Sequence, residues 1–342
     1  MATLPKPNKP LKILTIDGGT LEVGSKLIFL QRLLDASARN NGVPDSKPRP
    51  CDVFDVIAGI GSGGWLALLL GRFQMDTLAA MTEWYNLICC IVPRSKAEEL
   101  RMLLLQHSYY HTERLVEQID ELTEVYQTDK HMFFTPPEGS RCKHVFVSAL
   151  KTDSKDRQLK YNLFRTYDCP KGANVLEASQ NPHEYKISHA FQATAAAKYF
   201  TPPWKEPTAK RGISKCLDIE FPSPHNITEI ALNEMWGLYG KDVEIFIVVN
   251  IGVGEKLRRD KSKIESDIRE KLRNVYPEHT PPYYRLFSAP DRSAPGTSRK
   301  YTSPLKASLD YTKEYVRTRS VQIAMEEVGQ RIDLGTSELE MI

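Results

Sequence analysis

A glycine-rich turn between two apolar segments constrains this chain more than any other feature. The stretch Asp55–Leu70 reads DVIAGIGSGGWLALLL, which predicts a buried strand, a sharp turn and an apolar helix. Such a unit is typical of a nucleophile elbow, in which a serine lies between two glycines. Here the central position of the turn is Gly61. The run Gly59–Gly64 also satisfies a GxGxxG dinucleotide-binding fingerprint, so two kinds of site fit the turn.

Strands and helices alternate along the rest of the chain, which favours an α/β architecture. No internal repeat and no clear linker is visible, so we expect a single domain over 1–342, with a core of about 11–330 and tails at 1–10 and 332–342. The loop 289–303 is the segment we expect to be most mobile. The expected strands are 12–16, 53–58, 144–150, 161–167, 216–218, 244–251 and 284–287. The expected helices are 26–38, 65–72, 75–90 with Asp76 or Thr77 as N-cap, 97–125, 187–197, 227–239, about 257–275, and a terminal helix to about 331.

Charge and cysteine content exclude several classes of protein. The net charge of +3 over 342 residues does not indicate nucleic-acid binding, and the basic run 256–263 reads as the solvated face of a helix. The six cysteines have neither zinc-ligand nor disulfide-framework spacing, so we expect mostly buried thiols and no metal or other cofactor. The N-terminus has no apolar signal core, and no apolar run reads as a membrane span. We therefore expect a cytoplasmic protein with at most peripheral membrane contact.

The dinucleotide interpretation of the turn is the weaker one. A Rossmann unit needs an acidic residue at the end of the next strand, about 20 residues after the fingerprint. Asp76 and Glu83 lie in that range, but both fall inside a helical pattern. The fingerprint also lies outside the first strand–helix unit of the chain. We therefore do not expect bound NAD or FAD.

Five separated segments, in order, resemble the patatin-like phospholipase family, in a style closest to its fungal members. They are the IDGG after the first strand, PCDVFDVIAGIGSGGWLALLLGRFQMD, ISHAFQATAAAKYFTPP, CLDIEF with HNITEIALNEM, and IFIVVNIGVGEK, and they cover about 11–330. The resemblance implies a three-layer α/β fold, Rossmann-like, with a mostly parallel sheet between helices and a strand–elbow–helix motif. It also implies that Asp55–Leu70 is an elbow and not a cofactor loop.

The residues that carry the chemistry of this family match only in part. The family uses a Ser–Asp dyad; its serine falls on Gly61, and its aspartate falls on Asp218, which is present. The glycines after that aspartate are replaced by Ile219 and Glu220. In the oxyanion loop, Asp-Gly-Gly-Gly-x-Arg-Gly in the family, the third glycine, the arginine and the last glycine are replaced by Thr20, Glu22 and Val23.

Loss of the serine removes the nucleophile, which can cost on the order of a million-fold in turnover. Ser62 is not expected to replace it, because the residue after the nucleophile begins the helix and lends its N–H to the oxyanion hole. We expect carboxylates and a histidine to support other acid–base chemistry, with Asp218, Glu22, Glu220 and His225 as catalytic candidates. The structural alternatives are that Asp218 caps loop backbone and that Glu22 faces solvent. The substrate-binding candidates are Gly18, Gly19, Thr20, Gly61 and Ser62.

Three functions fit these residues, and we expect the first, with the other two as alternatives. The first is a non-hydrolytic cyclase, isomerase or lyase of fungal specialised metabolism, acting on an apolar, lipid-like or polyketide-like metabolite. The second is an inactive lipid-binding or regulatory pseudo-phospholipase, and the third is residual acyl hydrolysis. Tyr109, Tyr110 and His111 could line a lid, although a position on a helix face is the simpler interpretation. The sequence does not determine the ligand or the oligomeric state.

Overall fold

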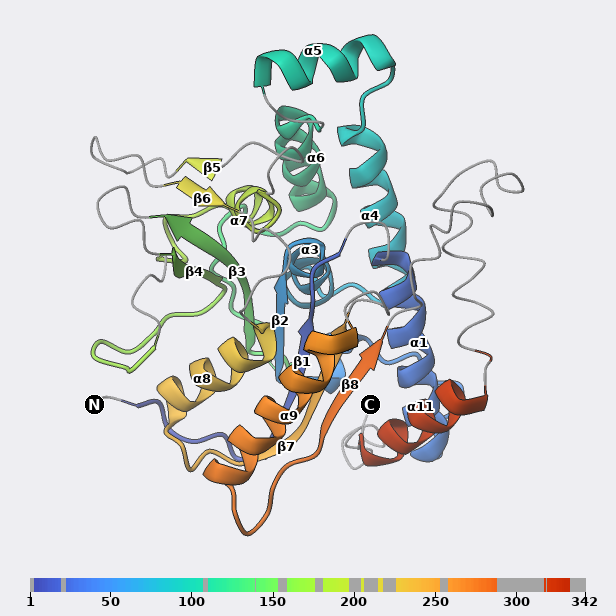
Figure 1. Cartoon of the computed structure of the whole chain (residues 1–342), viewed down its shortest axis with the longest axis vertical. Coiled ribbons are helices and arrows are strands. Elements are labelled where there is room, and N and C mark those ends of the chain that lie inside the picture. Colours follow the sequence, from blue (N-terminus) through green and yellow to red (C-terminus); the bar gives the residue numbers. More distant parts are fainter. Residues whose placement is uncertain are drawn as a thin grey trace.

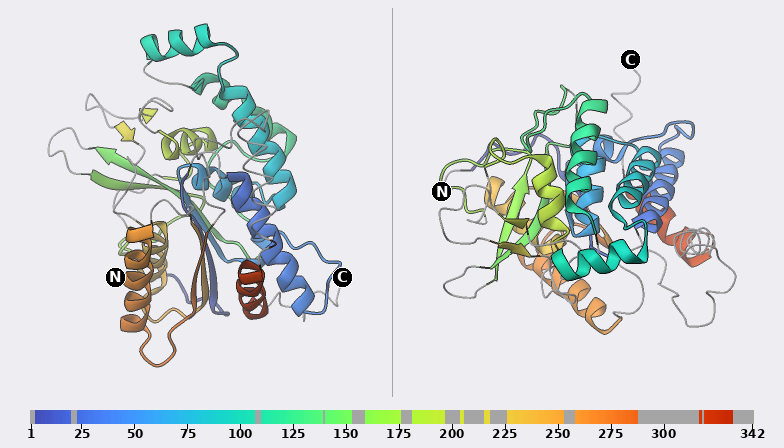
Figure 2. Two further views of the ribbon diagram at one scale, coloured as in Figure 1. Left: turned by 45° about the vertical axis from the view of Figure 1, so that its right-hand side comes forward. Right: turned by 90° about the horizontal axis from the view of Figure 1, so that it is seen from above.

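A computed structural model gives the arrangement of the chain in space (Figures 1 and 2). It describes residues 3–19, 23–106, 110–138, 140–152, 159–175, 181–196, 204–205, 215–217, 226–252, 258–287, 317 and 319–332.

Eight strands form one mixed sheet in the order β5-β6-β3-β2-β1-β7-β8, with β4 paired to β3. The run from β3 to β8 is parallel, whereas β4 and β6 are antiparallel to β3, and β5 is antiparallel to β6. The strands are β1 (Leu11–Ile16), β2 (Val56–Ile60), β3 (His144–Thr152), β4 (Leu159–Arg165), β5 (Trp204–Lys205), β6 (Lys215–Leu217), β7 (Ile245–Gly252) and β8 (Tyr283–Phe287).

Helices cover both faces of this sheet, so the architecture has three layers (Figure 2). One face packs against α1, α3, α4, α6, α7 and α11, and the other against α8 and α9. The helices are α1 (Val23–Asn40), α2 (Pro50–Val53), α3 (Ser62–Ala67), the π-helical turn η1 (Leu68–Arg72), α4 (Thr77–Ile91), α5 (Lys96–Gln106), α6 (Thr112–Val125), α7 (Ile187–Thr194), α8 (Ile227–Tyr239), α9 (Arg258–Val275) and α11 (Arg319–Arg331).

Strand β1 shows how the sequence builds the layers. All six of its residues are buried, as expected for a central strand of a parallel sheet. Leu14 and Ile16 point into the core on the α1 side, and Leu11 and Ile13 point into the core on the α8 side. This alternation follows from the two-residue period of a strand. The expected α/β fold, with a mostly parallel sheet between helices, is confirmed.

Parallel pairing brings several strand ends to one edge of the sheet. Ile16 at the end of β1 is opposite Gly59 in β2 and Ile251 in β7. Ile60 at the end of β2 is opposite Ser148 in β3. The loops that leave these strands are therefore neighbours, which is where an open α/β sheet commonly places its binding site.

Most predicted elements are present, and the differences have local causes. Helix Ile227–Tyr239 is confirmed at both ends, and Asp76 is the N-cap of α4, accepting bonds from two backbone amides at 2.8 Å. The expectation that β2 begins at Val53 is wrong, because Pro50 begins a short helix, α2, that ends at Val53. The helix after the glycine turn begins at Ser62, earlier than expected, and passes into a π-helical turn.

The remaining predictions are corrected by the structure or fall on residues that it does not describe. The expected helix 97–125 is two helices, α5 and α6, with residues 107–109 outside the described part. The loop 289–303 also lies outside it. Within the described residues, none of the helices combines the length and the apolar character needed to cross a bilayer. The single-domain organisation stays a prediction.

Candidate functional site

The turn between β2 and α3 has the geometry of an elbow. Strand β2 ends at Ile60, and helix α3 begins two residues later at Ser62. Gly61 joins them with φ 57° and ψ −132°. A residue with a side chain adopts this positive-φ conformation only under strain, which is a feature of nucleophile positions in elbows.

Two of the surrounding glycines are required by close backbone contacts. A Cβ atom on Gly59 would collide with the backbone of Gly63, and a Cβ on Gly63 would collide with the carbonyl groups of Ile16 and Asp17. The first turn of α3 therefore lies directly against the ends of β1 and β2. This close approach is what makes the turn sharp.

Gly61 differs from these glycines because there is room beside it. A Cβ at this position would lie 3.4 Å from Gly18 Cα and 4.0 Å from Thr194 O, which are ordinary contact distances. The absence of a side chain here is thus not imposed by packing. The Gly61 amide donates a hydrogen bond to Thr194 Oγ1 at 3.0 Å, and that hydroxyl donates to Ser148 O at 2.9 Å. Helix α7 therefore holds the elbow against the end of β3.

The loop after β1 forms the other side of the site. Gly18 lies against Ile60 and Gly61, since a Cβ on Gly18 would be 3.3 Å from Ile60 O and 3.9 Å from Gly61 Cα. The Ser62 hydroxyl donates a hydrogen bond to Gly19 O. The structure thus brings together four of the five expected substrate-binding residues: Gly18, Gly19, Gly61 and Ser62. The fifth, Thr20, lies outside the described residues.

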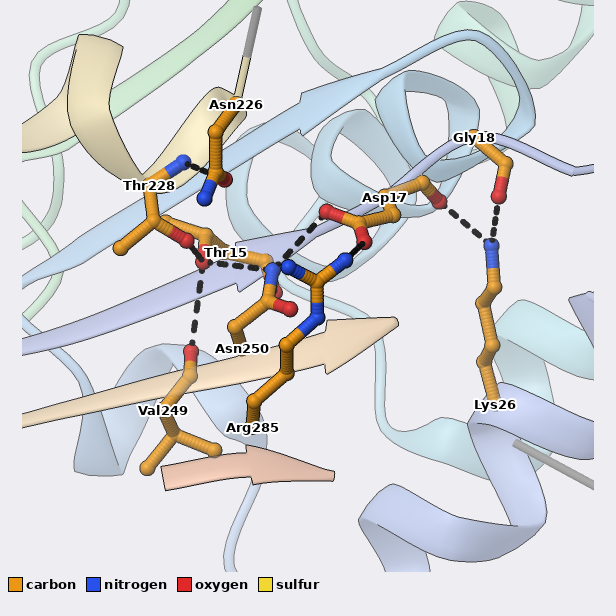
Figure 3. Close-up of polar contacts among 9 residues, drawn as sticks. All are labelled: Thr15, Asp17, Gly18, Lys26, Asn226, Thr228, Val249, Asn250 and Arg285. Atoms are coloured by element: carbon orange, nitrogen blue, oxygen red, sulfur yellow. Dashed lines mark hydrogen bonds and ion pairs between the residues drawn. The ribbon is translucent and has the colours of Figure 1, made fainter. Parts of the chain in front are cut away.

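A buried lysine holds the same loop from the side of α1. Lys26 is only 1% exposed, and its ammonium group donates to Asp17 O and to Gly18 O, the latter at 2.6 Å (Figure 3). Two successive carbonyl oxygens thus face one ammonium group. Sequence reasoning missed Lys26, although a lysine among the leucines of an apolar helix was a signal.

The Asp17 carboxylate is held by two side chains from neighbouring strands. Asn250 of β7 donates to Asp17 Oδ1 at 2.9 Å, and Arg285 of β8 donates to Asp17 Oδ2 at 2.8 Å (Figure 3). Asn250 Nδ2 is also 3.1 Å from Thr15 Oγ1, whose hydroxyl lies 2.8 Å from that of Thr228 at the start of α8. This polar cluster was also missed. Asn250, alone in the otherwise apolar stretch IFIVVNI, was the available signal.

None of the four expected catalytic residues is placed by the structure. Glu22, Asp218, Glu220 and His225 lie outside the described residues. Strand β6, however, ends at Leu217, which pairs with Leu150 in β3, two residues beyond the partner of Ile60. The chain thus arrives at position 218 from a strand that runs toward the elbow.

The remaining expectations concern cofactors and a lid. Asp76 caps α4 and Glu83 lies within α4, so neither ends a strand as a dinucleotide site requires. In the described part of the chain, no group of three or more His, Cys, Asp or Glu residues could hold a metal ion. Tyr110 and His111 lie at the junction of α5 and α6, so the expected position on a helix face is wrong for them, and Tyr109 is not described.

One curated relative resembles the chain in sequence. No protein-family profile matches the chain. Patatin-like phospholipase 1 of Plasmodium falciparum (isolate NF54) is 26% identical over 258 residues, which cover 72% of this chain and 36% of the relative. The chain is similar in sequence to a patatin-like phospholipase. The resemblance drawn from five separated segments is thereby confirmed, and the similarity to fungal members stays a prediction. The chain spans about a third of the length of this relative.

Three solved structures show a similar but distant arrangement. VipD from Legionella pneumophila has a TM-score of 0.38 and 11% identity, covering 90% of this chain and 66% of that one. ExoU, in its complex with SpcU from Pseudomonas aeruginosa, has a TM-score of 0.36 and 11% identity, covering 96% and 52%. Human GIVD cytosolic phospholipase A2, in complex with methyl gamma-linolenyl fluorophosphonate, has a TM-score of 0.36 and 12% identity, covering 97% and 58%.

Proposed function

We propose that this chain binds an apolar, lipid-like ligand at a patatin-type elbow and does not hydrolyse it through a serine nucleophile. The observation that carries the proposal is Gly61. It has the positive φ of an elbow and space for a Cβ, yet no side-chain oxygen. The turn thus keeps its shape without the atom that would attack an ester.

Backbone donors at the site support binding of an oxygen-bearing ligand group. Lys26 holds the carbonyl oxygens of Asp17 and Gly18. Because a peptide group is planar and trans, the N–H groups of Gly18 and Gly19 point away from Lys26. The N–H of Ser62, at the first position of α3, has no acceptor within its own helix. These donors suit a carbonyl, carboxylate or phosphate oxygen.

The neighbouring side chains do not supply a replacement nucleophile. The Ser62 hydroxyl donates its hydrogen bond to the backbone oxygen Gly19 O and not to a basic side chain. The Asp17 carboxylate is occupied by Asn250 and Arg285, so it is a poor general base. The described part of the site therefore favours binding over nucleophilic chemistry.

A second candidate is non-hydrolytic acid–base catalysis at the same site, such as cyclisation, isomerisation or elimination on an apolar metabolite. The observation that favours it is the direction of β6, which ends one residue before Asp218 and runs toward the elbow. Asp218 would be the acid–base group, with Glu22, Glu220 and His225 as further candidates. Once a converted ligand is known, unchanged conversion by Asp218→Asn would remove Asp218 from this role.

The test combines a covalent probe with a binding measurement. Incubation with an alkyl fluorophosphonate, followed by peptide mass mapping, should give no adduct in residues 55–70, and p-nitrophenyl esters should not be turned over. Titration calorimetry with oleate and lysophosphatidylcholine should show binding, which Gly61→Leu abolishes by filling the site. Gly42→Leu is the matched control, because Gly42 also has a positive φ of 76° but lies in open space.

Gly61→Ser should fold, since its Cβ has room, although the positive φ strains a residue with a side chain and should lower its stability. It should not restore ester turnover on its own. Thr20, Glu22 and Val23 also depart from the family pattern, so one added hydroxyl leaves the oxyanion loop altered. Robust turnover by this variant, or by the unmodified chain with an adduct at the elbow, contradicts the loss of hydrolysis. Binding of neither lipid, or equal binding by Gly61→Leu, contradicts the binding site.

A further inference from the structure

Helix α5 has its apolar and charged residues on unexpected sides. A surface helix normally turns its apolar stripe to the protein and its charges to water. In α5 the charged residue Glu98 faces the protein, while Leu100 and Leu104 are 57% and 67% exposed. Such exposed apolar surface commonly marks an interaction site.

The inward face of α5 is defined by specific contacts. Glu98 Oε1 is 2.9 Å from His111 Nε2 and 2.9 Å from an Arg114 guanidinium nitrogen, both on the α6 side. Met102, four residues after Glu98 and so on the same face, is buried. The orientation of α5 is thus set by one polar and one apolar contact.

The outward face follows from helix geometry. Two residues along a helix turn the side chain by about 200°, so Leu100 points opposite to both Glu98 and Met102. Leu104 and Ala97 share this outward side with Leu100 and are also exposed. No described element covers them.

Charge near this face favours an anionic partner. Lys96 and Arg101 are exposed on α5, and Arg94 is exposed just before it. Glu99 is the one exposed carboxylate of the helix, and Glu98 is engaged with Arg114. Outward leucines flanked by three cations and one anion suit contact with a lipid surface that carries anionic headgroups.

The position of α5 in the molecule also suits contact with a flat surface. The helix forms the extreme top of the molecule in Figure 1 and in the left view of Figure 2. The arrowheads of β3 and β8 point toward that end in Figure 1, so it is the end at which the parallel strands finish and the elbow lies. A surface that contacts α5 would therefore face the elbow side of the sheet.

We propose that α5 docks this chain on a lipid bilayer that contains anionic headgroups, with Leu100 and Leu104 entering the interface and Lys96, Arg101 and Arg94 contacting the headgroups. The proposal does not depend on turnover or on a ligand at the elbow. It is tested with the whole chain, by flotation with vesicles of phosphatidylcholine alone or of phosphatidylcholine with phosphatidylserine.

The unmodified chain should float with the mixed vesicles. Leu100→Glu/Leu104→Glu should lower partitioning roughly tenfold or more, because the apolar contact is lost. Lys96→Glu/Arg101→Glu should lower partitioning to the mixed vesicles roughly tenfold, with a smaller effect on neutral ones. The matched control is Leu78→Glu/Ile323→Glu, which replaces two exposed apolar residues of α4 and α11 and should change partitioning by less than about twofold.

Four outcomes overturn the proposal. The first three are no flotation of the unmodified chain, equal flotation of the α5 leucine variant, and an equal loss in the control. A fourth is that the unmodified chain sediments as a dimer that only the α5 leucine variant dissociates, without binding vesicles, since α5 is then an interface between copies. Melting curves of all variants separate these outcomes from loss of fold.

Discussion

The backbone amide of Gly61 donates a hydrogen bond to the hydroxyl oxygen of Thr194, at 3.0 Å. These residues are 133 positions apart, and both are buried. Because Thr194 also donates to Ser148 O, one hydroxyl joins the elbow, α7 and β3. The elbow is therefore held by a tertiary contact in addition to its own glycines.

Thr194→Val should destabilise the fold by about 1–3 kcal/mol, because it leaves the buried Gly61 N–H and Ser148 C=O without their partner. Urea unfolding monitored by circular dichroism measures the loss. Thr82→Val is the control: Thr82 donates to Leu78 O in an exposed turn of α4, and its loss should cost less than about 0.5 kcal/mol. Equal stability of the Thr194 variant and the unmodified chain would show that the bond contributes nothing.

Lys26→Met should loosen the loop after β1. The substitution keeps most of the side-chain volume but removes the donor to Asp17 O and Gly18 O. Hydrogen–deuterium exchange of the Asp17 amide, which donates to Ile251 O at 3.0 Å, should become faster, by roughly tenfold for each 1.4 kcal/mol lost locally. Lys143→Met, at an exposed position, should leave that exchange unchanged. Exchange that is equally slow in both variants contradicts a role for Lys26 in ordering the loop.

Glu234→Leu should cost about 3–5 kcal/mol in unfolding free energy. Glu234 and Arg165 form a buried two-bond ion pair between α8 and β4, at 2.6 and 2.8 Å, so removal of the carboxylate leaves a buried cation unpaired.

The double variant Arg165→Met/Glu234→Leu tests this cause, because it removes both charges and should recover most of the loss. Glu229→Gln, which breaks the more exposed pair with Lys271, should cost less than about 1 kcal/mol. If the double variant is as unstable as Glu234→Leu, the loss of unfolding free energy comes from packing and not from the unpaired charge.

Stability should depend on the protonation of His144. Burial lowers the pKa of His144 to about 4, from 6.5. The unfolded chain therefore takes up a proton at a higher pH than the folded one. This contribution to stability is present above about pH 6.5, decreases as the pH falls, and is lost by about pH 4; it amounts to about 3 kcal/mol.

His144→Gln, which can still bond Tyr239, should flatten the stability profile between these pH values. Burial also lowers the pKa of His189, and paired carboxylates titrate in acid, so the difference between variant and unmodified chain is the relevant measurement. If the unfolding free energies of the two proteins change with pH in the same way, His144 is not the cause of the pH dependence.

Local patterns predicted much of the fold because they depend on short-range physics. The apolar run before Gly59 and the helix after Gly61 give the strand–turn–helix unit, and the period of the leucines gives α1. Proline at the start of α2 was the signal missed when a strand was expected from Val53. In the region 97–125, two helices with similar composition read as one, because the periodic pattern does not show where the axis changes.

By itself, the sequence determined the order of strands and helices, the sharp glycine turn without a serine at its centre, and the resemblance to patatin-like phospholipases. Only the tertiary structure decided which side chains contact one another around the glycine turn and on α5. Asp17 and Arg285 are 268 positions apart, and their contact depends on the placement of β1 and β8 on either side of β7. The outward direction of Leu100 likewise depends on Glu98 contacting α6. Hydrophobic periodicity identifies a helix face, but the partners available in space determine which way that face turns.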